Sequence, residues 1–272
     1  MLQPNSIMKN SNICCLYDKK STKATNAFYS IKKYFNIEEL RVEKIKEYST
    51  VITLGGDGQI LRALHLTKNS KAEIFGMNLG SVGFLLNEYS IKNLLSRIRD
   101  SKYVRLNPLK MQLLTWDNQL LNLHAFNEIS LLREINQIAK IRIYIDNVMR
   151  MESLYADGVI VATPAGSTAY NFAASGPIIP LDANLLTITP ISPFRPRRWP
   201  GALIHDKSKI RLKILDYRKR PVSALADSKK IRNIQSVEVN LDRTVQKKIL
   251  FDKQSGLEER VFQEQFYKNT LY

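Results

Sequence analysis

The stretch TLGGDGQILRALH, residues 53–65, contains three of the chain's 11 glycines around a single aspartate, Asp57. The short apolar run before it, residues 51–54, is rich in β-branched residues and predicts a buried strand. The apolar residues after it recur at helical spacing and predict a helix. Gly55, Gly56 and Gly58 therefore lie in a tight strand-to-helix turn. Glycine there leaves backbone N–H groups open to an approaching phosphate.

Asp57 itself admits two interpretations. Aspartate is common in turns and at helix N-caps, so the residue can be purely structural. Its charge would also repel a phosphate, which indicates some other function if the turn binds one. Neither standard phosphate motif decides between the two. The chain has no GxxxxGK(S/T) motif, and Leu61 stands where GxGxxG needs its last glycine.

The length and composition limit the classes of protein to which the chain can belong. A chain of 272 residues suits one large or two ordinary domains, and 44% hydrophobic with 24% charged residues is typical of a soluble globular protein. No apolar run approaches the roughly 18 residues of a membrane-spanning helix, and the start lacks the order of a signal peptide. We therefore expect a cytoplasmic protein without a membrane partner. Cys14 and Cys15 are adjacent in an apolar run, which favours buried strand residues over a disulfide or metal site.

The net charge of +16 has three explanations: nucleic-acid binding, a substrate carrying several phosphates, or a surface that is simply soluble. No helix-turn-helix, zinc-finger or RNP1-type signature accompanies the charge, so we do not expect a specific nucleic-acid partner. His65, His124 and His205 are scattered along the chain without matching cysteines. We therefore expect no zinc site and no metal held by the protein alone.

The order of the patterns predicts the fold. Strand and helix patterns alternate up to residue 100, which predicts a parallel sheet with helices on its faces and ligands at the carboxyl ends of the strands. From residue 103 the apolar pattern changes to period two. We expect an α/β plus all-β protein. A Rossmann-like α/β domain (1–103) carries the phosphate loop, and a β-sandwich-like domain (104–255) follows. A helix (256–272) packs back on the first domain, and the site lies in a cleft between the two domains.

A second strand-to-helix turn lies in ADGVIVATPAGSTAY, residues 156–170. A strand at 158–162 ends at Thr-Pro-Ala-Gly, and a short helix begins with Ser167, Thr168, Ala169 and Tyr170. The hydroxyl residues serve equally well as ordinary helix caps, and Tyr170 as an ordinary packed ring. Taken alone, this turn does not specify a ligand.

Together the turns belong to a larger pattern. The GGDG turn, GMNLGSVGFL at 76–85, FNEIS at 126–130 and ADGVIVATPAGSTAY resemble the NAD kinase family in order and spacing. The similarity is strong over residues 51–180 and weaker to residue 228. GGDG alone also resembles the diacylglycerol and sphingosine kinases, and the later motifs distinguish the families.

The resemblance implies transfer of the γ-phosphoryl group of ATP to the 2′-hydroxyl of the adenosine ribose of NAD, giving NADP. It implies that Asp57 is catalytic, taking the proton of that hydroxyl or orienting it, while Gly55, Gly56 and Gly58 receive the ATP phosphates. Mg²⁺ is expected to arrive with ATP, with no tightly bound cofactor. A homotetramer, or a dimer, is also implied. The residues with implied roles in NAD binding are Asn127, Glu128, Asp157, Thr168, Ala169, Tyr170 and Asp227.

Gln59, Tyr155, Ala165 and Ala173 depart from the family's pattern and bear on individual hydrogen bonds to NAD more than on the reaction, and Phe194 stands where relatives often have His. Two other functions are compatible with parts of the sequence. A lipid kinase predicts a hydrophobic substrate pocket or a membrane-binding surface, whereas Asn127-Glu128 and the GSTAY turn offer polar contacts suited to a dinucleotide. A basic nucleic-acid-binding module leaves Asp57 without a role.

Overall fold

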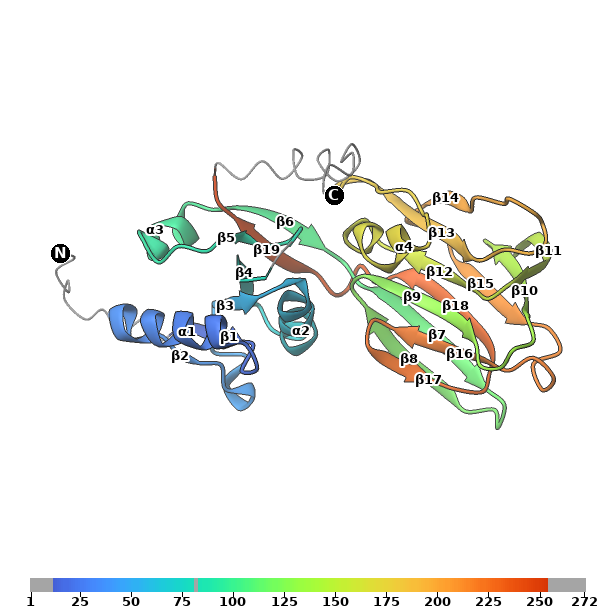
Figure 1. Ribbon diagram of the computed structural model, residues 1–272, viewed down its shortest axis with the longest axis horizontal. Coiled ribbons are helices and arrows are strands. Elements are labelled where there is room, and N and C mark those ends of the chain that lie inside the picture. The colour runs from blue at the N-terminus through green and yellow to red at the C-terminus, as the bar shows by residue number, and fades with distance from the viewer. Residues whose placement is uncertain (1–11, 81–82, 254–272) are drawn as a thin grey trace, which may run out of the picture. The chain divides into compact units, whose positions relative to one another are not determined.

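The computed structural model describes residues 12–80 and 83–253, which divide into two compact units (Figure 1). The first unit comprises the chain up to Leu106 together with the residues from Val245 onward, and the second is Asn107–Thr244. The first is α/β and the second is built almost entirely of strands. The fold class expected from the sequence is therefore confirmed.

The first unit contains one sheet in the order β2-β1-β3-β4-β19-β6, with β5 also paired to β4. Its strands are parallel except β6, which runs antiparallel to β19. The elements are β1 (Ile13–Tyr17), α1 (Thr22–Phe35), β2 (Glu38–Glu39), the 3₁₀ turn η1 (Val42–Lys44), β3 (Thr50–Gly55), α2 (Asp57–Thr67), β4 (Glu73–Asn78), β5 (Asn87–Glu88), α3 (Leu94–Arg99), β6 (Lys102–Leu106) and β19 (Lys247–Phe251).

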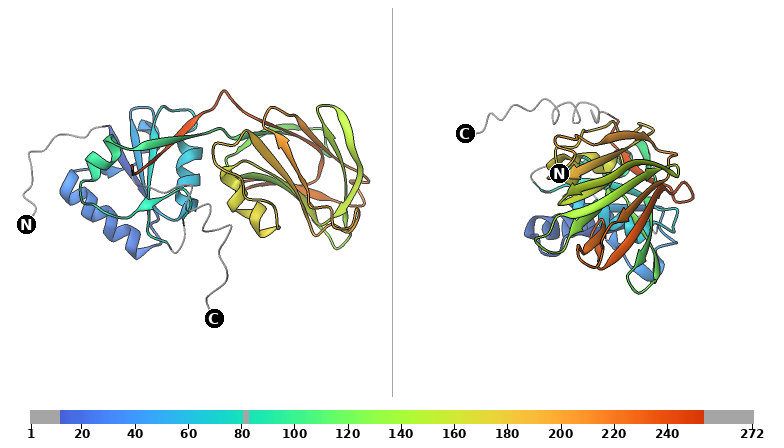
Figure 2. Two further views of the ribbon diagram at one scale, coloured as in Figure 1. Left: turned by 90° about the horizontal axis from the view of Figure 1, so that it is seen from above. Right: turned by 90° about the vertical axis from the view of Figure 1, so that its right-hand side faces the viewer.

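Helices cover both faces of this sheet because successive strand residues point to opposite sides. Phe75 and Met77 of β4 belong to one apolar cluster with Phe28 of α1. Gly76, between them, faces the other side, where an added Cβ would lie 2.5 Å from Cδ1 of Ile60 on α2. The left view of Figure 2 shows α1 and α2 on opposite sides of the strands.

The second unit contains two six-stranded antiparallel sheets, in the orders β11-β10-β15-β18-β7-β8 and β14-β13-β12-β9-β16-β17. Its elements are β7 (Leu109–Thr115), β8 (Leu120–Ala125), β9 (Glu128–Arg133), β10 (Ala139–Ile145), β11 (Val148–Ala156), β12 (Gly158–Ala162), the 3₁₀ turn η2 (Ala165–Thr168), α4 (Tyr170–Ala173), β13 (Leu185–Ile191), β14 (Ala202–His205), β15 (Ile210–Ile214), β16 (Val222–Ala226), β17 (Lys229–Ile231) and β18 (Ile234–Leu241).

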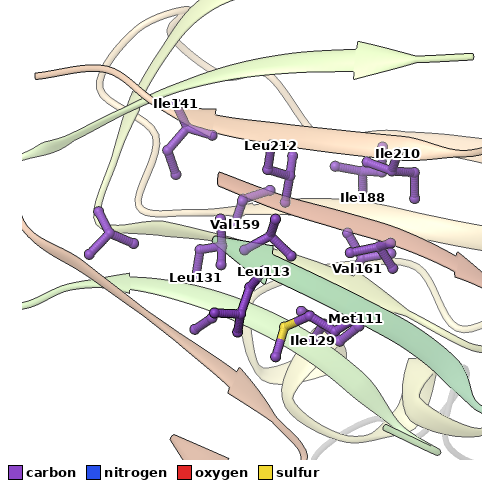
Figure 3. Packing of buried hydrophobic residues seen from close by; sticks show 14 of the residues in the cluster. Met111, Leu113, Ile129, Leu131, Ile141, Val159, Val161, Ile188, Ile210 and Leu212 are labelled. Atoms are coloured by element: carbon purple, nitrogen blue, oxygen red, sulfur yellow. The ribbon is translucent and has the colours of Figure 1, made fainter. Parts of the chain in front are cut away.

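The core of the second unit lies between these two sheets (Figure 3). Met111 and Leu212 come from one sheet, whereas Leu131, Val159 and Ile188 come from the other, and all five are buried. Alternate residues of each strand fill the interior, as a sandwich requires. This core supports β9, β12 and β16, the neighbouring strands from whose ends the candidate NAD-binding residues project.

The domain boundaries differ from those expected. The second unit ends at Thr244 rather than at residue 255, because β19 returns to the first sheet and lies between β4 and β6. The first unit also extends to Leu106 rather than to residue 103, because β6 pairs with β19. A period-two pattern predicts a strand but does not say which sheet it joins. The helix expected at 256–272 lies outside the described residues.

Candidate active site

The glycine turn of the first unit has the conformation that its sequence predicts. β3 ends at Gly55, whose φ of +150° disfavours other residues, and α2 begins at Asp57. Gly56 is the N-cap of α2, and the helix has no side-chain cap. A Cβ added to Gly56 or Gly58 would meet nothing within 4 Å. The backbone is therefore open on this side of the helix N-terminus, where N–H groups and the helix dipole favour an anion.

The carboxylate of Asp57 is oriented by backbone groups from a distant part of the chain. Its Oδ2 accepts a hydrogen bond from the N–H of Phe84 (2.9 Å), and its Oδ1 accepts one from the N–H of Leu85 (3.2 Å). Asp57 is not the N-cap of α2, since Gly56 occupies that position. The two bonds fix the direction of a carboxylate at the start of α2.

Asn78 is a candidate residue that the sequence analysis did not single out. It ends β4 directly beside Gly55 in the parallel register, and its Oδ1 accepts the N–H of Gly80 (2.9 Å). The carboxyl ends of neighbouring parallel strands are where α/β proteins bind ligands. The signal was present, because Asn78 lies within the GMNLGSVGFL motif, but its proximity to the glycine turn depends on strand order.

In the second unit, Asp227 organises the backbone of the Asn127-Glu128 pair. Its carboxylate accepts the N–H groups of Phe126 (2.8 Å), Asn127 (3.0 Å) and Glu128 (3.3 Å). Its own N–H donates to the carbonyl of Glu128 (3.1 Å), and its φ is +50°, in the left-handed region. Asp227 therefore stabilises the backbone at the start of β9.

Glu128 occupies an environment that opposes its charge. Burial, and then the nearby negative charge of Asp227, raises the pKa of Glu128 to about 7, against the opposing effect of a hydrogen bond from the N–H of Tyr170. Its Oε2 is buried, and within the described part of the chain it has no hydrogen-bond partner. A buried acceptor of this kind is costly unless a ligand supplies the missing donor.

The GSTAY turn is packed directly against Asn127. A Cβ at Gly166 would lie 2.1 Å from the carbonyl oxygen of Asn127, so only glycine allows this approach. The hydroxyl of Thr163 connects the two segments, donating to the carbonyl of Phe126 (2.7 Å) and accepting the N–H of Gly166 (3.1 Å). η2 ends at Thr168, Ala169 joins it to α4, and Tyr170 begins α4. The turn thus presents these three residues beside the Asn-Glu pair.

Two carboxylates, those of Glu128 and Asp157, act electrostatically on Tyr170. Its pKa is raised by burial, then by the negative charges of Glu128 and Asp157. The residue is still 37% exposed. Asp157, between β11 and β12, is half-exposed, and its Oδ1 lies 2.5 Å from Nε of Arg133. The second unit therefore gathers all seven residues assigned to NAD by the resemblance, while Asp57 and the glycine turn belong to the first unit.

Within the described residues, no group of three or more His, Cys, Asp or Glu side chains is arranged to hold a metal ion. In the same residues, none of the helices is long and apolar enough to span a membrane.

Comparison with known proteins gives a consistent result. The chain matches family models described as the ATP-NAD kinase N-terminal domain (residues 4–101) and the ATP-NAD kinase C-terminal domain (residues 126–250). It is 44% identical to an NAD kinase of Rickettsia felis over 259 residues, which cover 95% of this chain and 99% of that protein. It is also 44% identical to an NAD kinase of Zymomonas mobilis over 249 residues, 91% and 93% of the two chains.

Two solved structures share the fold. The crystal structure of yeast NADH kinase complexed with NADH matches with a TM-score of 0.81 at 21% identity, covering 96% of this chain and 89% of that one. An NAD kinase from Archaeoglobus fulgidus in complex with ATP matches with a TM-score of 0.73 at 23% identity, covering 92% and 96%.

Proposed function

The chain belongs to the NAD kinase family, and on that premise we propose that Asp57 and its glycine turn carry out the phosphoryl transfer while Asn127 and Glu128 hold NAD. The protein is a phosphotransferase that converts NAD to NADP, with ATP as the nucleotide bound by its kinase domain. The lipid-kinase and nucleic-acid alternatives are set aside, because both family models and the curated relatives are those of NAD kinases.

One observation supports the assignment of the reaction to Asp57. The carboxylate stands at the first residue of α2, next to backbone that is open at Gly56 and Gly58, and two backbone N–H groups orient it. We infer that the phosphates of ATP bind these open amides and the positive end of the helix dipole. A carboxylate beside them suits a reaction that must remove a proton from a hydroxyl next to a phosphate.

In the proposed reaction, Asp57 takes the proton of the adenosine 2′-hydroxyl as the oxygen attacks the γ-phosphorus in line. A bond forms between that oxygen and phosphorus, and the bond from phosphorus to the β,γ-bridging oxygen breaks. ADP leaves with the electron pair, and the proton passes from Asp57 to water. The bonds from Phe84 and Leu85 hold the carboxylate in one orientation throughout, which favours reaction by reducing the motion of the base.

For NAD, we propose that Glu128 accepts hydrogen bonds from ribose hydroxyls or the adenine amine through its buried Oε2. Asp227 supports this role by fixing the backbone of the Asn127-Glu128 pair. Thr168, Ala169 and Tyr170 line the neighbouring surface, and Asp157 contacts the nicotinamide end. This grouping is supported by the negative charges of Glu128 and Asp157, both of which raise the pKa of Tyr170.

We propose that Mg²⁺ enters with ATP rather than occupying a site built by the protein. Mg²⁺ commonly keeps several waters and binds substrate phosphates with only one or two carboxylates. The described residues fit that mode, because the carboxylate of Asp57 lies at the phosphate loop and they contain no group of three or more His, Cys, Asp or Glu side chains arranged to hold a metal ion. Bound there, the ion would neutralise charge that develops on the phosphates.

We also propose a homotetramer, or a dimer, assembled through the second unit, and a cytoplasmic location. Leu203 on the edge strand β14, Phe194 before it, and Val148 and Met149 on the edge strand β11 are large apolar side chains that are about half exposed. Edge strands with exposed apolar residues tend to be covered by another chain. Sedimentation velocity at several concentrations tests this, and a fully active monomer would contradict it.

The function is tested by incubating the full chain with Mg-ATP and NAD and detecting NADP with an NADP-specific dehydrogenase. NADP must accumulate in step with ADP. A protein with Asp100→Asn, a substitution of an exposed aspartate after α3, serves as the control and should match the native rate. ADP formation without NADP would contradict the proposal.

A further inference from the structure

Lys247 is a buried lysine for which neither the glycine turn nor the NAD-binding residues give a role. It is the first residue of β19 and is 2% exposed. Its Nζ donates to the backbone carbonyls of Thr67 (3.0 Å), Ser70 (2.9 Å) and Ala72 (2.6 Å). An ammonium group has three N–H donors, so all three are used. Lysine is almost never buried so completely without such compensation.

These three carbonyls lie at the carboxyl end of α2. Thr67 is the last residue of the helix, and Ser70 and Ala72 belong to the connection that leads into β4. The last carbonyls of a helix have no partner within it, and the helix dipole places partial negative charge there. A buried cation that binds them is therefore a C-terminal anchor for α2.

The opposite end of the same helix carries Asp57. α2 has 11 residues, which corresponds to a rod about 16 Å long. A helix transmits a displacement along its axis from one end to the other, since its backbone bonds are continuous. Ile60 fixes the helix against Gly76 of the sheet, and Lys247 fixes its far end to β19, which lies between β4 and β6.

We propose that Lys247 is a positioning residue for phosphoryl transfer. By binding the carbonyl of Thr67 at the end of α2 and two carbonyls of the connection that follows, it sets the place of Asp57 and of the open amides at the other end of the helix. The inference rests on the proposed role of Asp57. Catalysis depends steeply on such placement, because a misplacement of about 1 Å lowers a rate by about 10²-fold.

Deprotonation of Lys247 should change turnover with pH, which a merely structural role of the residue would not do. Burial lowers the pKa of Lys247 to about 8, while the charge of Glu73 on β4 acts in the opposite direction. The charged groups on the segments that Lys247 contacts are Lys248, which is ion-paired with Glu73, and His65, Lys68 and Lys71 in the last turn of α2 and the connection after it. Above that pH the neutral amine has only two N–H donors for three carbonyls. Turnover should therefore fall as the pH rises through about 8.

The experiment compares the native chain with Lys247→Arg, Lys247→Met and, as a matched control, Lys248→Met. Lys248 is the next residue, and its ammonium makes a partly exposed pair with Glu73. For each protein, the folded fraction is measured by circular dichroism. The kcat per folded molecule and the KM for ATP and for NAD are measured from about pH 6.5 to about pH 9.5, a range that spans the lysine titration.

We expect native kcat to fall above about pH 8 and the fall to be absent in Lys247→Arg, because a guanidinium keeps its charge. Lys247→Met should lower kcat per folded molecule by about 10²-fold with the KM for NAD within about twofold, and Lys248→Met should stay within about twofold of native. The proposal is overturned if Lys247→Arg keeps the native alkaline fall, or if Lys247→Met lowers only the folded fraction.

The experiment distinguishes misfolding of Lys247→Met and failure of the proposed function from failure of the Lys247 proposal. If Lys247→Met does not fold, the pH profiles of the native and Lys247→Arg proteins still decide. If the native chain makes no NADP at any pH, the proposed function has failed before Lys247 is tested.

Discussion

The ionisation of Glu128 should make NAD binding depend on pH near neutrality. Burial, and then the charge of Asp227, raises the pKa of this carboxyl to about 7, and its Oε2 is buried without a hydrogen-bond partner in the described residues. Only the ionised form is a full acceptor for two hydroxyl or amine donors of NAD. NAD affinity should therefore be high above pH 7 and fall as the pH decreases through 7.

The magnitude follows from the fraction ionised. With a pKa of about 7, about 90% of Glu128 is charged at about pH 8 and about 3% at about pH 5.5, so affinity falls by up to about 30-fold. The hydrogen bond sets a second limit. A bond to a charged group contributes about 1.5–3 kcal/mol, which is roughly 10- to 150-fold in affinity. The two estimates overlap, so a decrease of about 10- to 30-fold is expected.

Isothermal titration calorimetry of NAD into the ATP-free protein at several pH values measures this directly. Glu128→Gln should weaken binding at pH 8 and remove most of the pH dependence, because glutamine does not titrate. Glu238→Gln, at a surface pair with Lys209 in the same unit, is the matched control and should keep the native profile. A native affinity that does not change with pH, or a change that Glu128→Gln retains, would refute the assignment of the pH dependence to Glu128.

Further predictions concern the backbone around the two glycine turns. Gly166→Ala should weaken NAD binding by about 1–3 kcal/mol in calorimetry, because its Cβ would strike the carbonyl of Asn127, and unchanged affinity would contradict this packing. Gly58→Ala, where a Cβ meets nothing, should leave the free energy of unfolding within about 0.5 kcal/mol of native but raise the KM for ATP; an unchanged KM would place the phosphates elsewhere. Asp227→Asn should lower the free energy of unfolding in urea by about 1.5–3 kcal/mol, since an amide cannot accept all three N–H groups, and native stability would show that these bonds are weak.

Local patterns in the sequence predicted the first half of the fold well. The strand expected at 51–54 lies within β3, the helix expected after the glycine turn is α2, and α1 belongs to the alternation of strands and helices expected up to residue 100. These elements have strong periodicity and clear ends, such as Ser21, whose Oγ accepts the N–H of Ala24 at the start of α1. Such signals depend on neighbouring residues, which a sequence displays directly.

Features that depend on distant residues were not predictable in the same way. The return of β19 to the first sheet brings Lys247 to the end of α2, across about 180 positions of the chain. Phe84 and Leu85 reach Asp57 only once the chain after β4 has folded back on the glycine turn. Every residue but proline has a backbone N–H group. The pattern of side chains therefore does not predict which of these groups will bind a carboxylate.

The family resemblance named the residues of the candidate NAD-binding site in the second unit but not their contacts with one another. Family motifs indicated Glu128, Asp227 and Tyr170 one by one. The structure adds that Asp227 binds the backbone of Asn127-Glu128 and that Tyr170 donates its N–H to Glu128. It also adds a raised pKa for Glu128, which arises from burial and from a second carboxylate. Neither cause can be inferred from residues that are about 100 positions apart before the sheet order is known.

The measurement that tests the central claim most directly is the turnover of Asp57→Asn. Asparagine keeps the size of the side chain but cannot take the hydroxyl proton, and its amide cannot accept both N–H groups that orient Asp57. The kcat for NADP formation per folded molecule should fall by about 10²–10⁴-fold, the usual contribution of a positioned base, while calorimetry shows NAD affinity within about twofold of native. Near-native turnover of the folded variant would contradict the account and remove Asp57 from the chemistry.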